Sequence, residues 1–175
     1  FYGLCADPMP TVRRAAATAL VELVPAVPGG AHALATQILP ILRALAVDPQ
    51  DSVRFLAVDV AVAVARALGT PSEDKDLNKD EDKEKDSDKD TSMTSTTTTT
   101  ATTTTTTTTE TDSDPEATNV RKEVEDIVGQ LMEDRSWRVR YMSADRVVSV
   151  SAALGRRATE AVLAGRYAAL LADGE

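Results

Sequence analysis

Apolar residues recur at every third or fourth position in five stretches of the chain, and this spacing predicts five amphipathic helices. The predicted helices cover residues 12–24, 34–46, 52–68, 119–132 and 137–154. A sixth helical run extends from residue 159 to residue 171. Proline, glycine and aspartate separate the runs, at Pro25, Asp48, Pro49, Gly69 and Gly155. The pattern therefore predicts an all-α fold of short helices joined by tight turns.

The spacing also predicts which face of each helix is buried. The expected core residues of the five helices are Val12, Ala15, Ala16, Ala19, Leu20 and Leu23; Leu34, Ile38, Ile41, Leu42 and Leu45; Val53, Leu56, Ala57, Val60, Ala61, Val64 and Leu68; Val120, Val124, Ile127, Val128 and Leu131; and Val139, Met142, Val147, Val150 and Leu154. Only 3% of the residues are aromatic although 42% are hydrophobic. The core is therefore built from alanine, valine and leucine, a composition that favours closely packed helices.

Residues 71–117 lack this pattern. The segment begins with aspartate, glutamate and lysine, continues as a threonine tract, and has Leu77 and Met93 as its only large apolar residues. It holds 14 of the 28 acidic and 5 of the 19 basic residues, and thus the whole net charge of −9. Because so little apolar surface offsets the entropy of ordering, we expect a disordered insert. The predicted organisation is helical repeats over 1–70 and 118–175, separated by this insert.

A short pattern, an aspartate followed after four residues by Val-Arg, occurs three times. Its members are Asp7, Val12 and Arg13; Asp48, Val53 and Arg54; and Asp134, Val139 and Arg140. The first two copies are 41 residues apart, and the next distance of 86 exceeds one repeat by about the length of the insert. A period of about 40 residues is typical of HEAT and armadillo arrays of antiparallel helix pairs. The sequence therefore predicts a HEAT-repeat α-solenoid interrupted by one insert.

The repeated residues predict a structural ladder. The aspartate lies in the turn between the two helices of a pair, where it can accept hydrogen bonds from amides at the start of the second helix. The valine points into the core. The arginine can reach the aspartate of a neighbouring repeat. We therefore expect the three aspartates and three arginines to be structural residues and not a ligand site.

The three repeats resemble consecutive middle repeats of the protein phosphatase 2A scaffold (A) subunit. The resemblance rests on VRRAAA at 12–17, DSVRFLAV at 51–58 and SWRVRYM at 136–142. It implies a horseshoe-shaped, non-catalytic scaffold whose turns inside the helix pairs bind a regulatory subunit. The catalytic subunit would bind C-terminal repeats outside this sequence, and the location would be cytoplasmic and nuclear. The turn residues that the resemblance assigns to protein binding are Pro10, Thr11, Arg14, Gln50, Asp51, Ser52, Ser136, Trp137 and Arg138.

Two of these residues have a second interpretation. Trp137 lies at the start of a predicted helix, where it packs on the neighbouring repeat or serves as an interface hot spot, since tryptophan and arginine are common at hot spots. Ser52 serves equally well as a helix N-cap. At the ends, residues 1–4 resemble the last turn of a first helix and Glu175 lies within a turn, so we expect the middle of a longer array.

The remaining residues argue against an enzyme. One cysteine and one histidine form neither a disulfide framework nor a Cys/His zinc site. Cys5 is expected to be a packed small residue, and His32 a solvated residue of a Gly/Ala-rich linker. No cofactor, metal, membrane or nucleic-acid partner is predicted, because there is no phosphate loop, no apolar run of 18 residues and no basic excess.

Two other hypotheses remain open. The chain could be a different HEAT adaptor, of the nuclear-transport or chromosome-organising type, although such a protein need not preserve SWRVRYM. The insert could also act as an independent regulatory module, phosphorylated on threonine. A neutral expansion explains the insert as well, because a disordered segment tolerates added residues.

Overall fold

The computed structural model describes residues 1–69 and 114–172, which are helical almost throughout and contain no strand. The elements are α1 (Tyr2–Cys5), α2 (Pro10–Leu23), η1 (Val24–Ala26), α3 (Gly30–Ala33), η2 (Leu34–Ile38), α4 (Leu39–Ala46), α5 (Asp51–Ala67), α6 (Pro115–Met132), α7 (Trp137–Asp145), α8 (Val147–Leu154), α9 (Arg156–Ala158), η5 (Thr159–Leu163) and α10 (Ala164–Leu171). The predicted all-α fold is confirmed.

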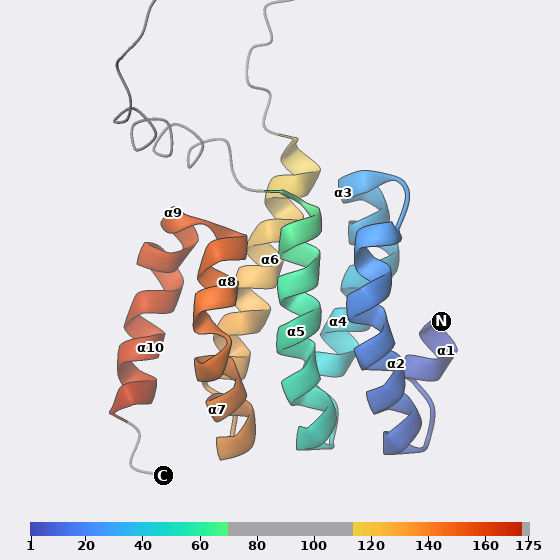
Figure 1. Cartoon of the computed structure of the whole chain (residues 1–175), viewed down its shortest axis with the longest axis horizontal. Coiled ribbons are helices and arrows are strands. Elements are labelled where there is room, and N and C mark those ends of the chain that lie inside the picture. The colour runs from blue at the N-terminus through green and yellow to red at the C-terminus, as the bar shows by residue number, and fades with distance from the viewer. Residues whose placement is uncertain (70–113, 173–175) are drawn as a thin grey trace, which may run out of the picture.

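The helices form a stack of antiparallel pairs in two layers (Figure 1). The second helices of successive pairs, α2, α5 and α7–α8, stand side by side, and the first helices α4 and α6 lie behind them. The central helix α5 packs against α2, α4, α6, α7 and α8. This is the arrangement of an α-solenoid, in which each pair contacts only its neighbours.

Burial follows the predicted apolar faces in most helices. In α5, Val53, Val60 and Val64 are completely buried as predicted, whereas Leu56 and Leu68 are half-buried. Val58, which was not expected in the core, is also completely buried, since this helix has neighbours on nearly every side. The expected core residues of α4 and α6 are also buried. Met142 and Val147, expected in the core of the third pair, are half-buried.

The prediction for α2 was partly wrong. Ala15, Ala19 and Leu23 are exposed, while Ala17 and Val24 are buried instead. The four alanines of α2 are distributed around the helix. Apolar periodicity therefore does not identify one face of this helix as the buried one. The orientation is set by packing on α5 and on the four-residue α1.

The predicted boundary of the insert at residue 117 was also wrong. Helix α6 begins at Pro115, and the side chain of its N-cap residue Asp114 accepts a hydrogen bond from the Glu116 amide at 3.0 Å. Proline at the first helical position and an acidic first turn both favour a helix start here. Residues 115–117 therefore belong to the helix and Asp114 caps it, and the rest of the predicted insert lies outside the described residues.

The end of α5 and the start of α6, which flank the insert, are linked by hydrogen bonds at one edge of the stack. Arg121 of α6 donates hydrogen bonds to the carbonyls of Gly69 at 2.6 Å and Ala153 at 3.2 Å, at the ends of α5 and α8. The end of α5 and the start of α6 lie at the edge opposite the turns inside the helix pairs (Figure 1). The predicted position of the insert, away from those turns, is therefore confirmed for its flanking residues.

Three helices are less regular than predicted. The predicted helix 137–154 is broken at Arg146 between α7 and α8. A π-helical segment, η2, precedes Pro40, whose missing N–H favours a wide turn. A second π-helical segment, η5, occupies the equivalent place before Gly165, where the repeat has no proline. Within the described ranges, no helix is long and apolar enough to cross a bilayer.

Candidate protein-binding edge

Each turn inside a helix pair is fixed by its repeated aspartate. In all three turns the Oδ1 atom accepts a hydrogen bond from the amide two residues further on, Asp7 from Met9 at 2.8 Å, Asp48 from Gln50 at 2.8 Å and Asp134 from Ser136 at 2.7 Å. The donors are the N-cap residues of α2, α5 and α7. Each aspartate lies two residues before the N-cap residue, so it shapes the turn that leads into the helix and does not cap the helix itself.

The repeated arginines bind the same turns from the other side. The Nη1 atoms of Arg13, Arg54 and Arg140 donate to the carbonyl oxygens of Asp7, Asp48 and Asp134 at 2.8, 2.8 and 3.0 Å. These carbonyls lie in turns, where helix hydrogen bonds do not satisfy them, and the guanidinium groups provide them with a charged donor.

Arginine and aspartate also link successive repeats, as the sequence predicted. Arg13 donates to Asp48 through Nε at 2.6 Å and Nη2 at 2.9 Å. Arg54 donates in the same bidentate way to Asp134, with both distances 2.8 Å. The second link spans the insert without any change in geometry.

The environment of Asp134 lowers the pKa of its carboxyl group. Burial raises the pKa of its carboxyl, but the hydrogen bonds from Arg54 and from the Ser136 amide more than offset this effect. The pKa of Asp134 therefore lies below its usual value. The side chains of Arg54 and Asp134 are only 6% and 11% exposed, so water screens this ion pair weakly.

The valines of the ladder anchor the second helices. Val53 and Val139 are completely buried, as predicted. Val12 is only half-buried. The turns are thus fixed by hydrogen bonds on one side and by core packing on the other.

The nine residues assigned to protein binding all retain some exposure. Five of them are exposed, namely Thr11, Arg14, Gln50, Trp137 and Arg138, and four are half-buried, namely Pro10, Asp51, Ser52 and Ser136. They line one edge of the stack, at the starts of α2, α5 and α7 (Figure 1). The N-cap interpretation of Ser52 was wrong, because Gln50 is the N-cap residue of α5.

Trp137 is not packed into the neighbouring repeat. It is 56% exposed, and the Arg138 guanidinium lies 5.6 Å from its ring centroid. The Ser136 hydroxyl lies 3.1 Å from Asp51 Oδ2, and Arg138 Nη1 lies 3.8 Å from the same oxygen. The side chains of Ser136 and Arg138 in the third turn therefore contact Asp51 in the second turn, beside the exposed Trp137.

The resemblance missed two apolar residues at this edge. Met9 is 59% exposed at the start of α2, and Tyr141 is 63% exposed on α7. Tyr141 follows Trp137 by four residues, and this spacing alone places both on one face of a helix.

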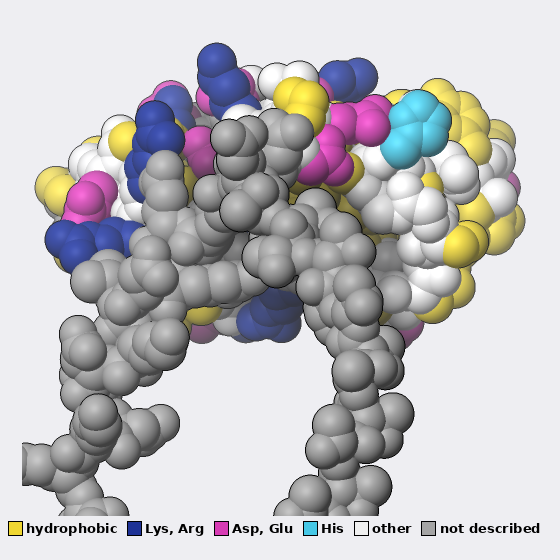
Figure 2. Space-filling model, turned by 90° about the horizontal axis from the view of Figure 1, so that it is seen from above, with side chains coloured by type: hydrophobic (Ala, Val, Ile, Leu, Met, Phe, Trp, Pro, Cys, Tyr) yellow, Lys and Arg dark blue, Asp and Glu magenta, His cyan; other side chains and the backbone are white. Residues whose placement is uncertain are grey.

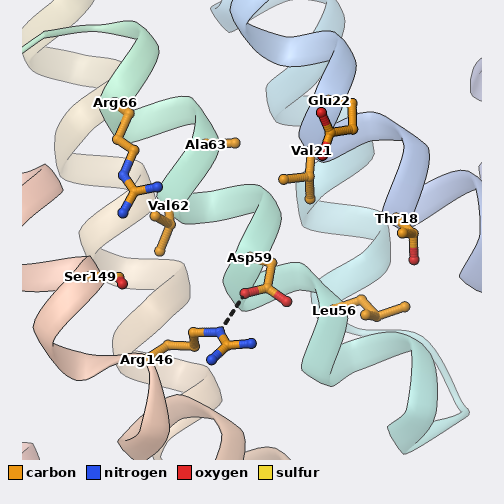
Figure 3. Close-up of a pocket in the computed structure, with 10 residues that line it drawn as sticks. All are labelled: Thr18, Val21, Glu22, Leu56, Asp59, Val62, Ala63, Arg66, Arg146 and Ser149. Carbon is orange, nitrogen blue, oxygen red and sulfur yellow. Dashed lines mark hydrogen bonds and ion pairs between the residues drawn. The ribbon is translucent and has the colours of Figure 1, made fainter.

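A shallow groove crosses the layer of second helices (Figure 3). Its volume is about 310 Å³, and it lies between α2, α5 and α8. Asp59 and Arg146 form an ion pair of 2.8 Å at one end, and Glu22 and Arg66 line the other. The apolar side chains of Val21, Leu56 and Val62 also line the groove.

The single cysteine and the single histidine lie in different surroundings. Cys5 is buried as expected, and burial raises the pKa of its thiol. His32 is exposed as expected, but it lies in α3 and not in a linker, with its Nδ1 3.0 Å from Glu116 Oε1 (Figure 2). In the parts of the chain that the structure describes, no three His, Cys, Asp or Glu residues are grouped to hold a metal ion.

Comparison with known families supports the repeat assignment. Residues 1–27 match the HEAT repeat family, and this match covers the first turn, α2 and η1. The repeated turns at Asp48 and Asp134 have the same hydrogen bonds as the turn in the matched segment. No curated protein matches the chain significantly. Residues 1–27 are thus similar to a HEAT repeat, and the described helices form an α-solenoid whose later turns repeat the same geometry.

Proposed function

We propose that this HEAT-repeat chain is a non-catalytic scaffold of a protein phosphatase 2A-type holoenzyme, and that its turn edge binds the regulatory subunit. The observation that carries the proposal is Trp137. It is accessible, and it lies between the polar turn residues Ser136 and Arg138 at the edge that the family resemblance assigns to this contact.

The edge has the physical properties that a protein interface needs. The ladder fixes its turns, so little conformational entropy is lost when a partner binds. Tryptophan and arginine at its surface are the residue types that most often dominate interface energetics. The described residues that flank the insert, at the end of α5 and the start of α6, lie at the opposite edge from these turns (Figure 1).

The proposal extends to the other partners and to location. The catalytic subunit would bind repeats outside residues 1–175, so this chain would associate with it indirectly. The complex would act in the cytoplasm and the nucleus. Neither a nucleic acid nor a membrane is a proposed partner.

A pull-down tests the proposal. The full chain is immobilised and incubated with a purified regulatory subunit of protein phosphatase 2A. We expect capture by the wild type, and a loss of about 1 kcal/mol or more of binding free energy for Trp137→Ala, because an exposed tryptophan in an interface centre is a typical hot spot.

Two controls separate this contact from folding and from the insert. Helix content of Trp137→Ala should equal that of the wild type, since its side chain is not in the core. Removal of residues 71–113 should leave affinity unchanged at high salt. No capture of the regulatory subunit by the wild type, with capture of a nuclear-transport or chromosome-organising partner instead, would favour the other HEAT adaptor class.

A further inference from the structure

The segment between α8 and α10 carries two adjacent arginines just before a threonine, in the string Arg156-Arg157-Ala158-Thr159. An arginine three residues before a serine or threonine occurs three times in the chain, before Ser143, Ser149 and Thr159, and only the string before Thr159 contains a second arginine. Guanidinium groups on the N-terminal side of a hydroxyl are complementary to carboxylates beside the active site of an arginine-directed protein kinase. The three hydroxyls are therefore three candidate phosphorylation sites, which the fold distinguishes.

The fold argues against both serines. Ser143 is 1% exposed, and its hydroxyl donates to the Val139 carbonyl at 2.9 Å inside α7. Ser149 is half-buried in the groove of Figure 3, and its preceding arginine, Arg146, donates to Asp59 and Asp145 at 2.8 and 2.6 Å. Neither string thus combines an accessible hydroxyl with an arginine that can turn to a kinase.

The arginines before Thr159 are accessible. Arg156 and Arg157 are both exposed. The Nε atom of Arg156 donates to Glu160 Oε1 at 2.7 Å, but both side chains are 64% exposed, and an ion pair so open to solvent is weak. A carboxylate on a kinase surface can therefore replace Glu160 as the partner of Arg156.

The hydroxyl of Thr159 lies in a short and irregular stretch of helix. Gly155, with φ of 90°, separates the three-residue α9 from α8, and η5, which begins at Thr159, is π-helical. Thr159 is half-buried, and its Oγ1 atom donates to the Gly155 carbonyl at 2.8 Å. Over residues 156–161 only Ala158 is buried, and its side chain is small. Local opening therefore exposes little apolar surface, and it lets the segment extend in a kinase cleft.

We propose that Thr159 is a phosphorylation site for an arginine-directed serine/threonine kinase. The Thr159 Oγ1 atom attacks the γ-phosphorus of ATP in the kinase, a new O–P bond forms, and the bond between that phosphorus and the β–γ bridging oxygen breaks, so that ADP leaves. A catalytic carboxylate of the kinase accepts the hydroxyl proton. The product loses the hydrogen bond to Gly155, and its phosphate, with a charge of about −1.5 to −2, gains Arg156 as a neighbour three residues away.

This proposal is independent of the proposed function. Helix α9 lies at the edge opposite the turns inside the helix pairs (Figure 1). A phosphate on Thr159 therefore adds negative charge away from the turn residues.

Phosphorylation of the native full chain tests the proposal. The probe is the purified catalytic subunit of cyclic-AMP-dependent protein kinase, with ATP and Mg²⁺, and mass spectrometry of peptides locates the phosphate. We expect one phosphoryl group, on Thr159. Thr159→Val should abolish its incorporation and Thr159→Ser should retain it. Arg156→Gln/Arg157→Gln should lower the initial rate by about 10-fold or more, because the charge complementarity is lost.

Matched variants control for charge and for the other hydroxyls. Arg14→Gln/Arg66→Gln removes the same charge from two other exposed arginines, and its rate should stay within about twofold of the wild type. Ser149→Ala should also keep the rate of the wild type. All variants should keep its helix content.

Several results would overturn the proposal. One is phosphate on Ser143, on Ser149 or only within residues 91–111. Another is a rate that the loss of Arg156 and Arg157 does not change. A third is phosphorylation of a synthetic peptide of residues 152–163 but not of the native chain, since the fold would then withhold the hydroxyl. Absence of phosphate from both the peptide and the chain would overturn it as well.

Discussion

Replacement of Asp134 by alanine should destabilise the solenoid by about 3 kcal/mol, because it leaves a buried charge without its partner. Arg54 is 6% exposed and loses both of its 2.8 Å hydrogen bonds to the carboxylate. The turn also loses the 2.7 Å hydrogen bond from the Ser136 amide. Arg54 keeps its hydrogen bonds to the carbonyls of Asp48 and Pro49, which limits the loss.

The exposed pair between Arg146 and Asp59 provides the comparison. Its distance, 2.8 Å, equals that of the ladder pair, but its side chains are 39% and 29% exposed. Solvent screens such a pair, and Asp59→Ala should cost less than about 1 kcal/mol. The two variants therefore separate the effect of burial from the effect of distance.

Urea unfolding followed by far-ultraviolet circular dichroism measures the difference. Urea is preferable to guanidinium chloride, which would screen the ion pairs. The fluorescence of Trp137 is a weak probe of unfolding because its side chain is already exposed. Equal destabilisation by Asp134→Ala and Asp59→Ala would refute the argument from burial.

A double-mutant cycle and a pH series refine the result. Arg54→Met combined with Asp134→Ala should cost less than the sum of the single variants, by about 1–3 kcal/mol, since neither charge then remains unpaired. The pKa of Asp134 is lower in the folded state than in the unfolded state. Its contribution is therefore complete above the unfolded pKa of about 4 and is lost as the pH falls through the lower folded pKa. The stability difference between the wild type and Asp134→Asn should shrink in that acidic range, and a constant difference would contradict the assigned cause.

Three further predictions concern the core, the turns and the thiol. Leu42→Ala should lower the free energy of unfolding by about 2–5 kcal/mol in urea titrations, because its side chain is fully buried, whereas Leu171→Ala, 72% exposed, should change it little. Gly155→Ala should lower the free energy of unfolding by about 1–3 kcal/mol, since Gly155 has φ of 90°. Gly129→Ala should lower it less, because the three atoms nearest to its new Cβ all belong to the flexible end of Arg166. Thermal melts in which Gly129→Ala is the less stable variant would contradict this reasoning. Cys5 should react with a thiol reagent much more slowly in the native chain than in urea, since burial raises the pKa of its thiol; equal rates would exclude that burial.

Much of the fold could be predicted from periodicity and from the repeat. The apolar faces of α4 and α6 were predicted correctly, because leucine, isoleucine and valine at helical spacing define one stripe. The face of α2 was not, because alanine occurs on several sides of that helix. The helix was predicted to start at residue 119, four residues after the observed start of α6 at Pro115, although Asp114, Pro115 and Glu116 are a helix-start pattern.

The candidate site shows the same division. The Asp and Val-Arg pattern predicted the ladder, since residues repeated at fixed spacing occupy equivalent places in adjacent repeats. The exposure of Trp137 could not be predicted, because the first residue of a helix can face either the neighbouring repeat or solvent. Tyr141 was missed for a related reason, as it lies beyond the turn to which the resemblance drew attention.

The sequence by itself therefore determined the helices, their pairing and the period of the ladder, since these depend on local spacing and on repetition. Only the tertiary structure decided which side of α2 is buried, where the second helix of the third pair breaks, and which side chains of α7 remain accessible. Those outcomes depend on how much neighbouring surface each helix meets, and that quantity is a property of the packed array and not of any one segment.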